Sequence, residues 1–295
     1  MAKMELQRPS SWSPAIAELK YAGHLLVQNK VVLSGAVIAA GVILTAVFGP
    51  LIVPETVATN IYLPGRLLPP SSTHWLGTDD YGRDLFQVII LSTRLDVSAT
   101  LTIVLADLFI GILLGAFSGF IGGKLDEGLM RVTDVFFSIP TLVLALAVAA
   151  ALGRGLNNLI LAIIIVGWPG YTRILRGQVL AEKERLYVDA LRSLGIGRFR
   201  IIIRHVIPNT IYPVIVQATL DLGGNVLVFA GLSFLGFGAT ALTPELGRLI
   251  TAGQTYIFQA PWLTAFPGLG ILIISLAFNL MGDGIRDVLD PRLRR

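Results

Sequence analysis

Six apolar segments, each close to twenty residues long, constrain this 295-residue chain more strongly than any other feature. The hydrocarbon layer of a membrane is ~30 Å thick, and roughly 20 helical residues cross it. The segments are continuous and do not alternate every second residue, which disfavours a transmembrane β-barrel. The sequence therefore predicts an all-α, polytopic membrane protein with six transmembrane helices. These are expected at about residues 31–53, 96–120, 132–152, 159–175, 211–235 and 263–281.

The composition supports this class and excludes several others. Hydrophobic residues make up 54% of the chain and charged residues only 14%, too few for the surface of a soluble domain of this length. Because the chain has no cysteine, it has no disulfide framework, thiolate metal site or cysteine nucleophile. The N-terminus lacks the pattern of a cleavable signal peptide, so the first apolar segment is expected to remain as an anchor.

The distribution of Lys and Arg predicts the orientation of the chain in the membrane. With a cytoplasmic N-terminus, 18 of the 23 Lys and Arg residues face the cytoplasm. The opposite topology would reverse this bias, whereas cytoplasmic loops normally carry the excess of positive charge. The prediction is a multi-pass protein of the cell membrane with both termini in the cytoplasm.

These assignments give a single membrane domain, residues 31–285, between two cytoplasmic ends. The N-terminal end, residues 1–30, is expected to contain a surface helix over 12–30 whose apolar side chains lie in the lipid headgroup layer. The alternative is a disordered tail as far as Gln28. The remaining segments are extracytoplasmic loops at 54–88 and 237–262, the latter with a short helix after Pro244, a cytoplasmic loop at 178–208 and a cytoplasmic tail at 286–295.

The cytoplasmic loop is polar, charged and internally ordered. Good helix formers with acidic residues near the start predict a helix from about Ala181 to Leu194. Gly195 is placed to end this helix in the left-handed conformation, where φ is positive. A second, basic helix is expected from Arg198, and Pro208 opens the turn before the fifth span. A loop that only sets topology would need neither this length nor this order.

The spacing in this loop resembles the coupling loop of ATP-binding-cassette (ABC) importer permeases. That pattern is Glu-Ala-Ala, three residues, Gly, nine residues and then Ile-x-Leu-Pro. Here the triplet is Asp189-Ala190-Leu191, Gly195 follows at the required distance, and His205, Ile207 and Pro208 close the pattern. Asp189, Leu191 and His205 depart in residue type and leave the spacing intact. The resemblance implies contact with a partner ATPase through Tyr187, Asp189, Ala190, Leu191, Gly195 and Pro208.

Four further segments, in order along the chain, resemble the C-type permease subunit of the dipeptide, oligopeptide and nickel importers. They are Gln28-Asn-Lys-Val, His74-Trp-Leu-Gly-Thr-Asp-Asp-Tyr-Gly-Arg-Asp84, Ser233-Phe-Leu-Gly-Phe-Gly238 and Ala277-Phe-Asn-Leu-Met-Gly-Asp-Gly-Ile-Arg-Asp287. The resemblance implies a type I ABC importer permease fold in a prokaryotic membrane. It also implies import of di- or oligopeptides by alternating access, with oligosaccharides or nickel as the alternative cargo.

The same resemblance implies the partners of the chain. These are a second permease subunit in a heterodimer, two cytoplasmic ATPase subunits and an extracytoplasmic substrate-binding protein, with membrane lipid around them and no nucleic acid. ATP and Mg²⁺ would bind to the ATPase subunits. The chain itself is therefore expected to hold no cofactor and not to be an enzyme.

Two of these segments also have a structural interpretation. Thr78, Asp79 or Asp80 is expected to cap the helix that enters the second span, and this is favoured over direct contact with substrate. Gly282-Asp-Gly284 is expected to end the sixth span and let the chain turn along the cytoplasmic surface.

Glycines and prolines inside the spans predict packing and kinks. Gly111, Gly115 and Gly119 recur every four residues, so a second helix is expected to pack closely on this face of the second span. Pro140 and Pro169 each remove an amide donor from a helix and are expected to bend it.

Asp107 and Asp221 lie inside apolar segments, where a carboxylate is costly and normally faces the bundle interior, a partner or a water-filled path. Asp221 is the better candidate for a translocation path, because its span follows the cytoplasmic loop directly. For Asp107 a structural role is favoured. An intramembrane enzyme that uses the two as a carboxylate pair is the alternative from another functional class.

No metal or catalytic signature accompanies these carboxylates. His24, His74 and His205 are assigned to both sides of the membrane and cannot form one metal site. Gly119–Lys124 superficially suggests a phosphate loop, but the first glycine and the final Ser or Thr of that motif are missing. The sequence thus predicts no catalytic residue.

Overall fold

The computed structural model describes residues 30–240 and 242–289, and every regular element within these ranges is helical. This confirms the all-α prediction. The predicted surface helix at 12–30 and His24 fall outside the described residues, apart from Lys30 at the start of the first described helix. In chain order the elements are α2 (Lys30–Ile52), α3 (Thr56–Thr59), η1 (Leu63–Gly65), α4 (Leu85–Ile121), α5 (Gly123–Phe137), α6 (Thr141–Leu152), α7 (Leu156–Glu182), α8 (Leu186–Ser193), α9 (Arg198–Ile201), η2 (Ile202–Val206), α10 (Ile207–Thr210), α11 (Tyr212–Leu232), η3 (Ser233–Phe237), α12 (Leu246–Gln254) and α13 (Trp262–Leu289).

Among the described residues, five helices are long and apolar enough to cross a membrane: α2, α4, α7, α11 continued by η3, and α13. The pair α5 and α6 passes the same test when taken together but is bent by 93° at its junction, as in a broken span or a re-entrant loop. The six-span prediction therefore has its elements in the right places, with a break in the predicted third span. The break lies at Pro140, which has no amide hydrogen to continue the helix and restricts the residue before it.

The expected start of the second span and the expected end of the sixth need correction. The helix of the second span starts at Leu85, about three turns before the boundary expected near Asp96, because α4 is continuous from Leu85 to Ile121. Pro169 lies inside α7, which runs from Leu156 to Glu182. Gly282-Asp-Gly284 does not end the last span, since α13 runs through it to Leu289, beyond the expected boundary at 285.

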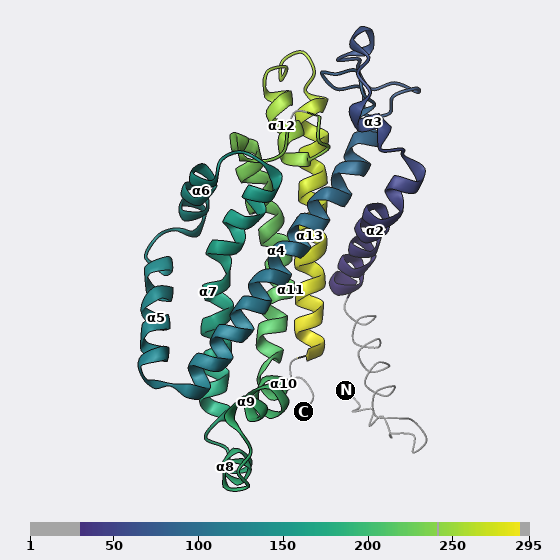
Figure 1. Ribbon diagram of the computed structural model, residues 1–295. Coiled ribbons are helices and arrows are strands. Elements are labelled where there is room, and N and C mark those ends of the chain that lie inside the picture. The colour runs from purple at the N-terminus through teal and green to yellow at the C-terminus, as the bar shows by residue number, and fades with distance from the viewer. Residues whose placement is uncertain (1–29, 241, 290–295) are drawn as a thin grey trace, which may run out of the picture.

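The glycine stripe of α4 packs on α7, as predicted. A Cβ at Gly111 would collide with the side chain of Tyr171, and one at Gly115 would meet the carbonyl oxygen of Thr172 at 2.6 Å. Glycine thus lets the two backbones approach along the length over which α4 and α7 lie together (Figure 1).

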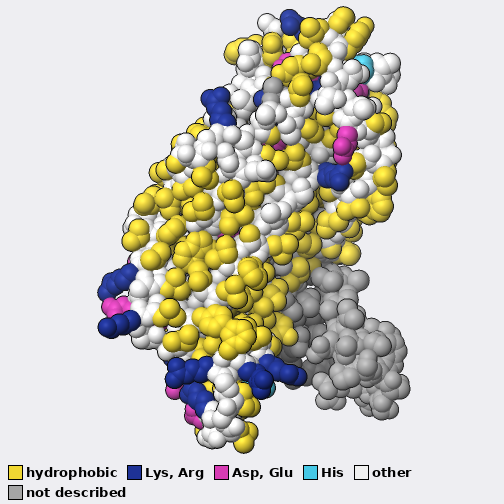
Figure 2. Space-filling model, viewed as in Figure 1, with side chains coloured by type: hydrophobic (Ala, Val, Ile, Leu, Met, Phe, Trp, Pro, Cys, Tyr) yellow, Lys and Arg dark blue, Asp and Glu magenta, His cyan; other side chains and the backbone are white. Residues whose placement is uncertain are grey.

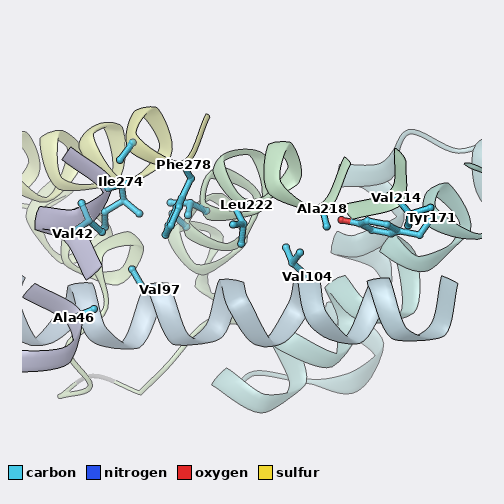
Figure 3. Packing of buried hydrophobic residues seen from close by; sticks show 14 of the residues in the cluster. Val42, Ala46, Val97, Val104, Tyr171, Val214, Ala218, Leu222, Ile274 and Phe278 are labelled. Atoms are coloured by element: carbon cyan, nitrogen blue, oxygen red, sulfur yellow. The ribbon is translucent and has the colours of Figure 1, made fainter. Parts of the chain in front are cut away.

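The core lies between α2, α4, α11 and α13, where Figure 3 shows small and branched side chains interdigitating. Val42 and Ala46 of α2, Val97 of α4 and Phe278 of α13 are buried in this cluster. The outer faces of the spans instead expose apolar side chains, and Figure 2 shows these covering the middle of the molecule. Such a surface suits a lipid environment, where apolar exposure carries no penalty.

The two ends of the bundle differ in content. The start of α2, the end of α13 and helices α8 to α10 lie at one end, and α3 and α12 lie at the other (Figure 1). Lys and Arg side chains gather around the end that carries α8 (Figure 2). The cytoplasmic loop predicted at 178–208 and the outer loops predicted at 54–88 and 237–262 thus occupy opposite ends of the bundle.

Candidate coupling loop and intramembrane polar site

The loop after α7 is two helices and a sharp stop, but its first helix is shorter than predicted. Ala181 and Glu182 still belong to α7, the chain breaks at Lys183–Arg185, and α8 starts at Leu186. The break is held by Glu182, which is buried, accepts a 2.7 Å hydrogen bond from the Tyr187 hydroxyl and pairs with Arg185 at 2.9 Å. Burial and this bond raise the pKa of the Tyr187 hydroxyl above its ordinary value.

Gly195 has φ of +75°, which confirms its predicted conformation. Its amide donates to the carbonyl of Arg192 at 2.9 Å, and the amide of Ile196 donates to the carbonyl of Leu191 at 3.2 Å. These two bonds form a Schellman motif, which satisfies the last carbonyls of α8. Ile196 and Leu191 are both half-buried against the core, so the same turn is fixed by apolar packing.

One face of the loop is buried against the body of the protein, and the opposite face is exposed. Val188 of α8 and Ile201, Ile202 and Val206 of the second helix are fully buried. In contrast, Leu186 is 87% exposed, Leu194 76% and Phe199 67%. Sequence reasoning did not single these three out, although apolar residues among charges in a polar loop are the signal that identifies them.

The residues predicted to contact the ATPase are divided between these two sides. Asp189, Ala190, Gly195 and Pro208 are exposed, and Asp189 forms only an exposed 3.0 Å ion pair with Arg192. Tyr187 and Leu191 are half-buried and face the body of the protein. Tyr187 also accepts a 3.4 Å hydrogen bond from the Asn209 side chain, so it ties α8 to both α7 and α10.

Asp221 lines an open cavity on the side of the bundle. The cavity has a volume of about 400 Å³ and lies between α7, α11 and the end of α5. The Gln217 side chain, one turn earlier on α11, donates a 2.8 Å hydrogen bond to Asp221 Oδ1. The opposite wall carries Arg173, which bonds to Asp134 at 2.5 Å and lies 4.3 Å from the Phe137 ring centroid.

Asp107 lies beside this cavity but is buried behind its wall. Its carboxyl occupies the space that a side chain at Gly167 would need. Gly167, against which the Asp107 carboxyl packs, lines the same cavity as Tyr171 and Asp221, so the three polar side chains lie in one region of the bundle. Sequence reasoning named both carboxylates but missed Tyr171, because an aromatic residue in an apolar span is usually core.

The segment from His74 to Asp84, predicted to lie in an outer loop, is held by polar contacts within the chain. Asp79 and Arg83 form a buried 2.6 Å ion pair, and Arg83 also donates to the carbonyls of Ala58 and Leu242. The expected helix cap is wrong in residue: Asp84, not Thr78, Asp79 or Asp80, accepts the amide of Gln87 at 3.2 Å and caps α4.

Among the described residues, no three His, Asp or Glu side chains form a group that fits a metal ion. His74 bonds to Asp84 at 2.8 Å in the outer loop, whereas His205 lies in the loop at the other end. His74 and His205 thus lie at opposite ends of the bundle, and His24 lies outside the described residues.

Comparison with known proteins identifies the family. Residues 111–295 match the family described as binding-protein-dependent transport system inner membrane component. The chain is 42% identical over 268 residues to the probable D,D-dipeptide transport system permease protein of Escherichia coli strain K12, covering 91% of this chain and 90% of that protein. It is 42% identical over 233 residues to the nickel transport system permease protein of the same strain, covering 79% and 84%. It is 34% identical over 293 residues to the oligopeptide transport system permease protein of Bacillus subtilis strain 168, covering 99% and 93%. The chain therefore belongs to the binding-protein-dependent inner membrane components, as a multi-pass permease subunit of an ABC importer.

Proposed function

We propose that this permease subunit imports di- or oligopeptides across the cell membrane by alternating access, with its N-terminus in the cytoplasm. The observation that carries the ATP-driven part of this function is the ordered loop that exposes Leu186, Leu194 and Phe199. Large apolar side chains held at a polar end of the molecule mark a protein interface. Two relatives are named for D,D-dipeptide and oligopeptide transport, which supports a peptide cargo, and a third is named for nickel transport, which supports the alternative.

Permeases of ABC importers work with further permease, ATPase and binding-protein subunits. For this chain the expected assembly is a heterodimer with a second permease, two cytoplasmic ATPases and an extracytoplasmic binding protein. ATP hydrolysis belongs to the ATPases. The cytoplasmic orientation of the loop is supported by the 18 of 23 Lys and Arg residues that fall on its side.

The loop has the contacts needed to pass motion to the spans. Tyr187 of α8 bonds to Glu182 at the end of α7 and to Asn209 of α10, which leads into α11. Closure of the ATPases would displace α8, and these bonds would carry the displacement to α7 and α11. These two helices flank the cavity at Asp221, so the same movement would open or close a path there.

Uptake by the reconstituted complex tests this function. Vesicles that contain both permeases and both ATPases, with loaded binding protein outside, should accumulate a labelled dipeptide only with ATP inside. Nickel and an oligosaccharide, each with the same binding protein, serve as competing cargo. Accumulation of either one without peptide uptake would overturn the peptide assignment and leave the importer family unchanged.

A further inference from the structure

Three polar side chains from three different spans lie around the cavity at Asp221. Asp107 comes from α4, Tyr171 from α7 and Asp221 from α11. Asp107 and Tyr171 are buried, and in the described part of the chain neither Asp107 Oδ1 nor the Tyr171 hydroxyl has a hydrogen-bond partner. Figure 3 shows the Tyr171 ring reaching toward Ala218 and Val214 of α11, the helix that carries Asp221. The cluster is therefore incomplete as it stands.

In the described part of the chain, no cationic side chain pairs with the two carboxyls of this cluster. The ion pairs formed by the described residues do not include Asp107 or Asp221, and the one polar side chain bonded to Asp221 is the neutral Gln217. The nearest cation on the cavity wall is Arg173, which is engaged by Asp134 and Thr133 on the other side. Two carboxyls at this depth without a cation are costly, which favours a bound cationic group as the compensating charge.

The cavity has room for such a group. Its volume of about 400 Å³ lies within the range of ligand pockets, and it is open on one side, so a small organic cation can enter it. Gly170 leaves space on the wall, since a Cβ there would meet nothing within 4 Å, while Phe137 and Ile174 supply apolar surface. A cationic group on an organic body fits this combination of carboxylate and apolar wall better than a bare metal ion.

We propose that Asp221, oriented by Gln217 and supported by Tyr171 and Asp107, binds the free α-ammonium group of the cargo as it passes through this subunit. This inference rests on the proposed peptide import and adds where the peptide amino terminus is held. An N-acylated peptide or a neutral oligosaccharide lacks the charge that the cluster requires. Gln217 acts as a positioning residue, because its amide holds one carboxylate oxygen and leaves the other for the ligand.

The absence of cysteine makes a direct occupancy test possible. Gly170→Cys places one thiol on the cavity wall at a position with room for it, and Ile174→Cys gives a second, independent reporter. Labelling of this chain by N-ethylmaleimide is followed in the nucleotide-free complex, reconstituted in lipid nanodiscs. A dipeptide at about four times its dissociation constant should slow labelling about fivefold, whereas the N-acetylated dipeptide should not.

Variants and controls decide between this site and other causes of protection. Asp221→Asn should abolish protection by the dipeptide, and Glu127→Gln, which removes an exposed carboxylate, should leave it unchanged. Equal protection by the dipeptide and its N-acetylated form, or by Na⁺ alone, would overturn the ammonium assignment. If the wild-type complex takes up dipeptide but neither reporter is protected, this inference fails while peptide import stands. If uptake itself fails, the proposed function is at fault.

Discussion

The two ends of the bundle differ in whether their charged and apolar side chains are buried and paired within the chain. At the outer end, Asp79 and Arg83 are 1% and 2% exposed and satisfy each other, and Arg83 reaches across to the carbonyls of Ala58 and Leu242. At the end that carries α8, the ion pair of Asp189 with Arg192 is exposed and the apolar side chains of Leu186 and Leu194 face outward. The buried charges of the outer end are thus paired within the chain, whereas we propose that a partner covers the exposed face of the loop.

This difference separates stability from association. Removing a contact at the outer end should unfold or loosen the permease itself, because a buried partner is left unpaired. Removing an exposed side chain from the cytoplasmic loop should leave the permease intact and weaken its assembly. Variants at the two ends can therefore test the comparison directly.

The largest effect is expected from Arg83→Met. It leaves the Asp79 carboxylate buried without its partner, which typically costs about 3–5 kcal/mol. The thermal unfolding temperature of the purified permease heterodimer should fall sharply, or the subunit should fail to accumulate. Arg66→Met, at an exposed position of the same loop, should have little effect. Equal stability of the two variants would break the view that the outer end is a self-sufficient scaffold.

Gly195→Val should come next, with its effect on assembly. The positive φ of Gly195 is strongly unfavourable for a β-branched residue, and the strain is on the order of 1–3 kcal/mol. The Schellman turn should distort and redirect the second helix, so co-purification with the ATPase subunits and dipeptide uptake should be lost. Gly197→Val is the matched control, because Gly197 has an ordinary φ of −62° and open space around it. Normal assembly of the Gly195 variant would remove the main support for the coupling function.

Leu186→Ser and Leu194→Ser together should weaken assembly without strain. Both side chains are exposed, so the unfolding temperature of the isolated permease should stay unchanged. Loss of an apolar anchor from an interface costs about 1–2 kcal/mol, or roughly tenfold in affinity for the ATPases. Phe258→Ser, which removes an exposed aromatic side chain from the other end, is the control. A loss of stability in place of affinity would show that these leucines belong to the permease core.

A structural feature of this chain was predictable from the sequence when its physical cause lies within a short segment. The spans and the conformation of Gly195 depend on apolar length and on glycine stereochemistry, both readable in a short window. The break at Pro140 was predicted in the same way, from the missing amide hydrogen of one residue. The continuation of α13 through Gly282 depends on a neighbouring helix, because Gly282 packs against the backbone of Thr219 on α11. Likewise, the meeting of Asp107, Tyr171 and Asp221 requires three spans to come together, which no single segment encodes.

A smaller effect at the outer end is a pH dependence carried by Glu245. This residue is fully buried at the start of α12, and burial raises the pKa of its carboxyl above the ordinary value near 4.5, despite the favourable charge of Arg248. The folded state therefore keeps a proton that the unfolded state has released, so stability falls as the pH rises from about 4.5 toward the raised pKa. Glu245→Gln should flatten this slope in unfolding temperature, and the exposed Glu55→Gln should not. If the unfolding temperature instead rose with pH over this range, Glu245 would be ionised in the folded state and this prediction would be wrong.

The smallest effect on stability is expected at the exposed ion pair of Asp189 with Arg192. Surface ion pairs contribute about 0–1 kcal/mol, so Arg192→Gln should change the unfolding temperature of the isolated permease hardly at all. Asp189→Lys should be equally neutral for stability, yet it reverses a charge on the bare face of α8 and should weaken ATPase association if that face is the contact. Adding salt should reduce the difference between Asp189→Lys and the unmodified chain, because an exposed electrostatic contact is screened. An association defect that is insensitive to salt would mean that the substitution acts by disturbing α8, and that the acid itself is not read by the partner.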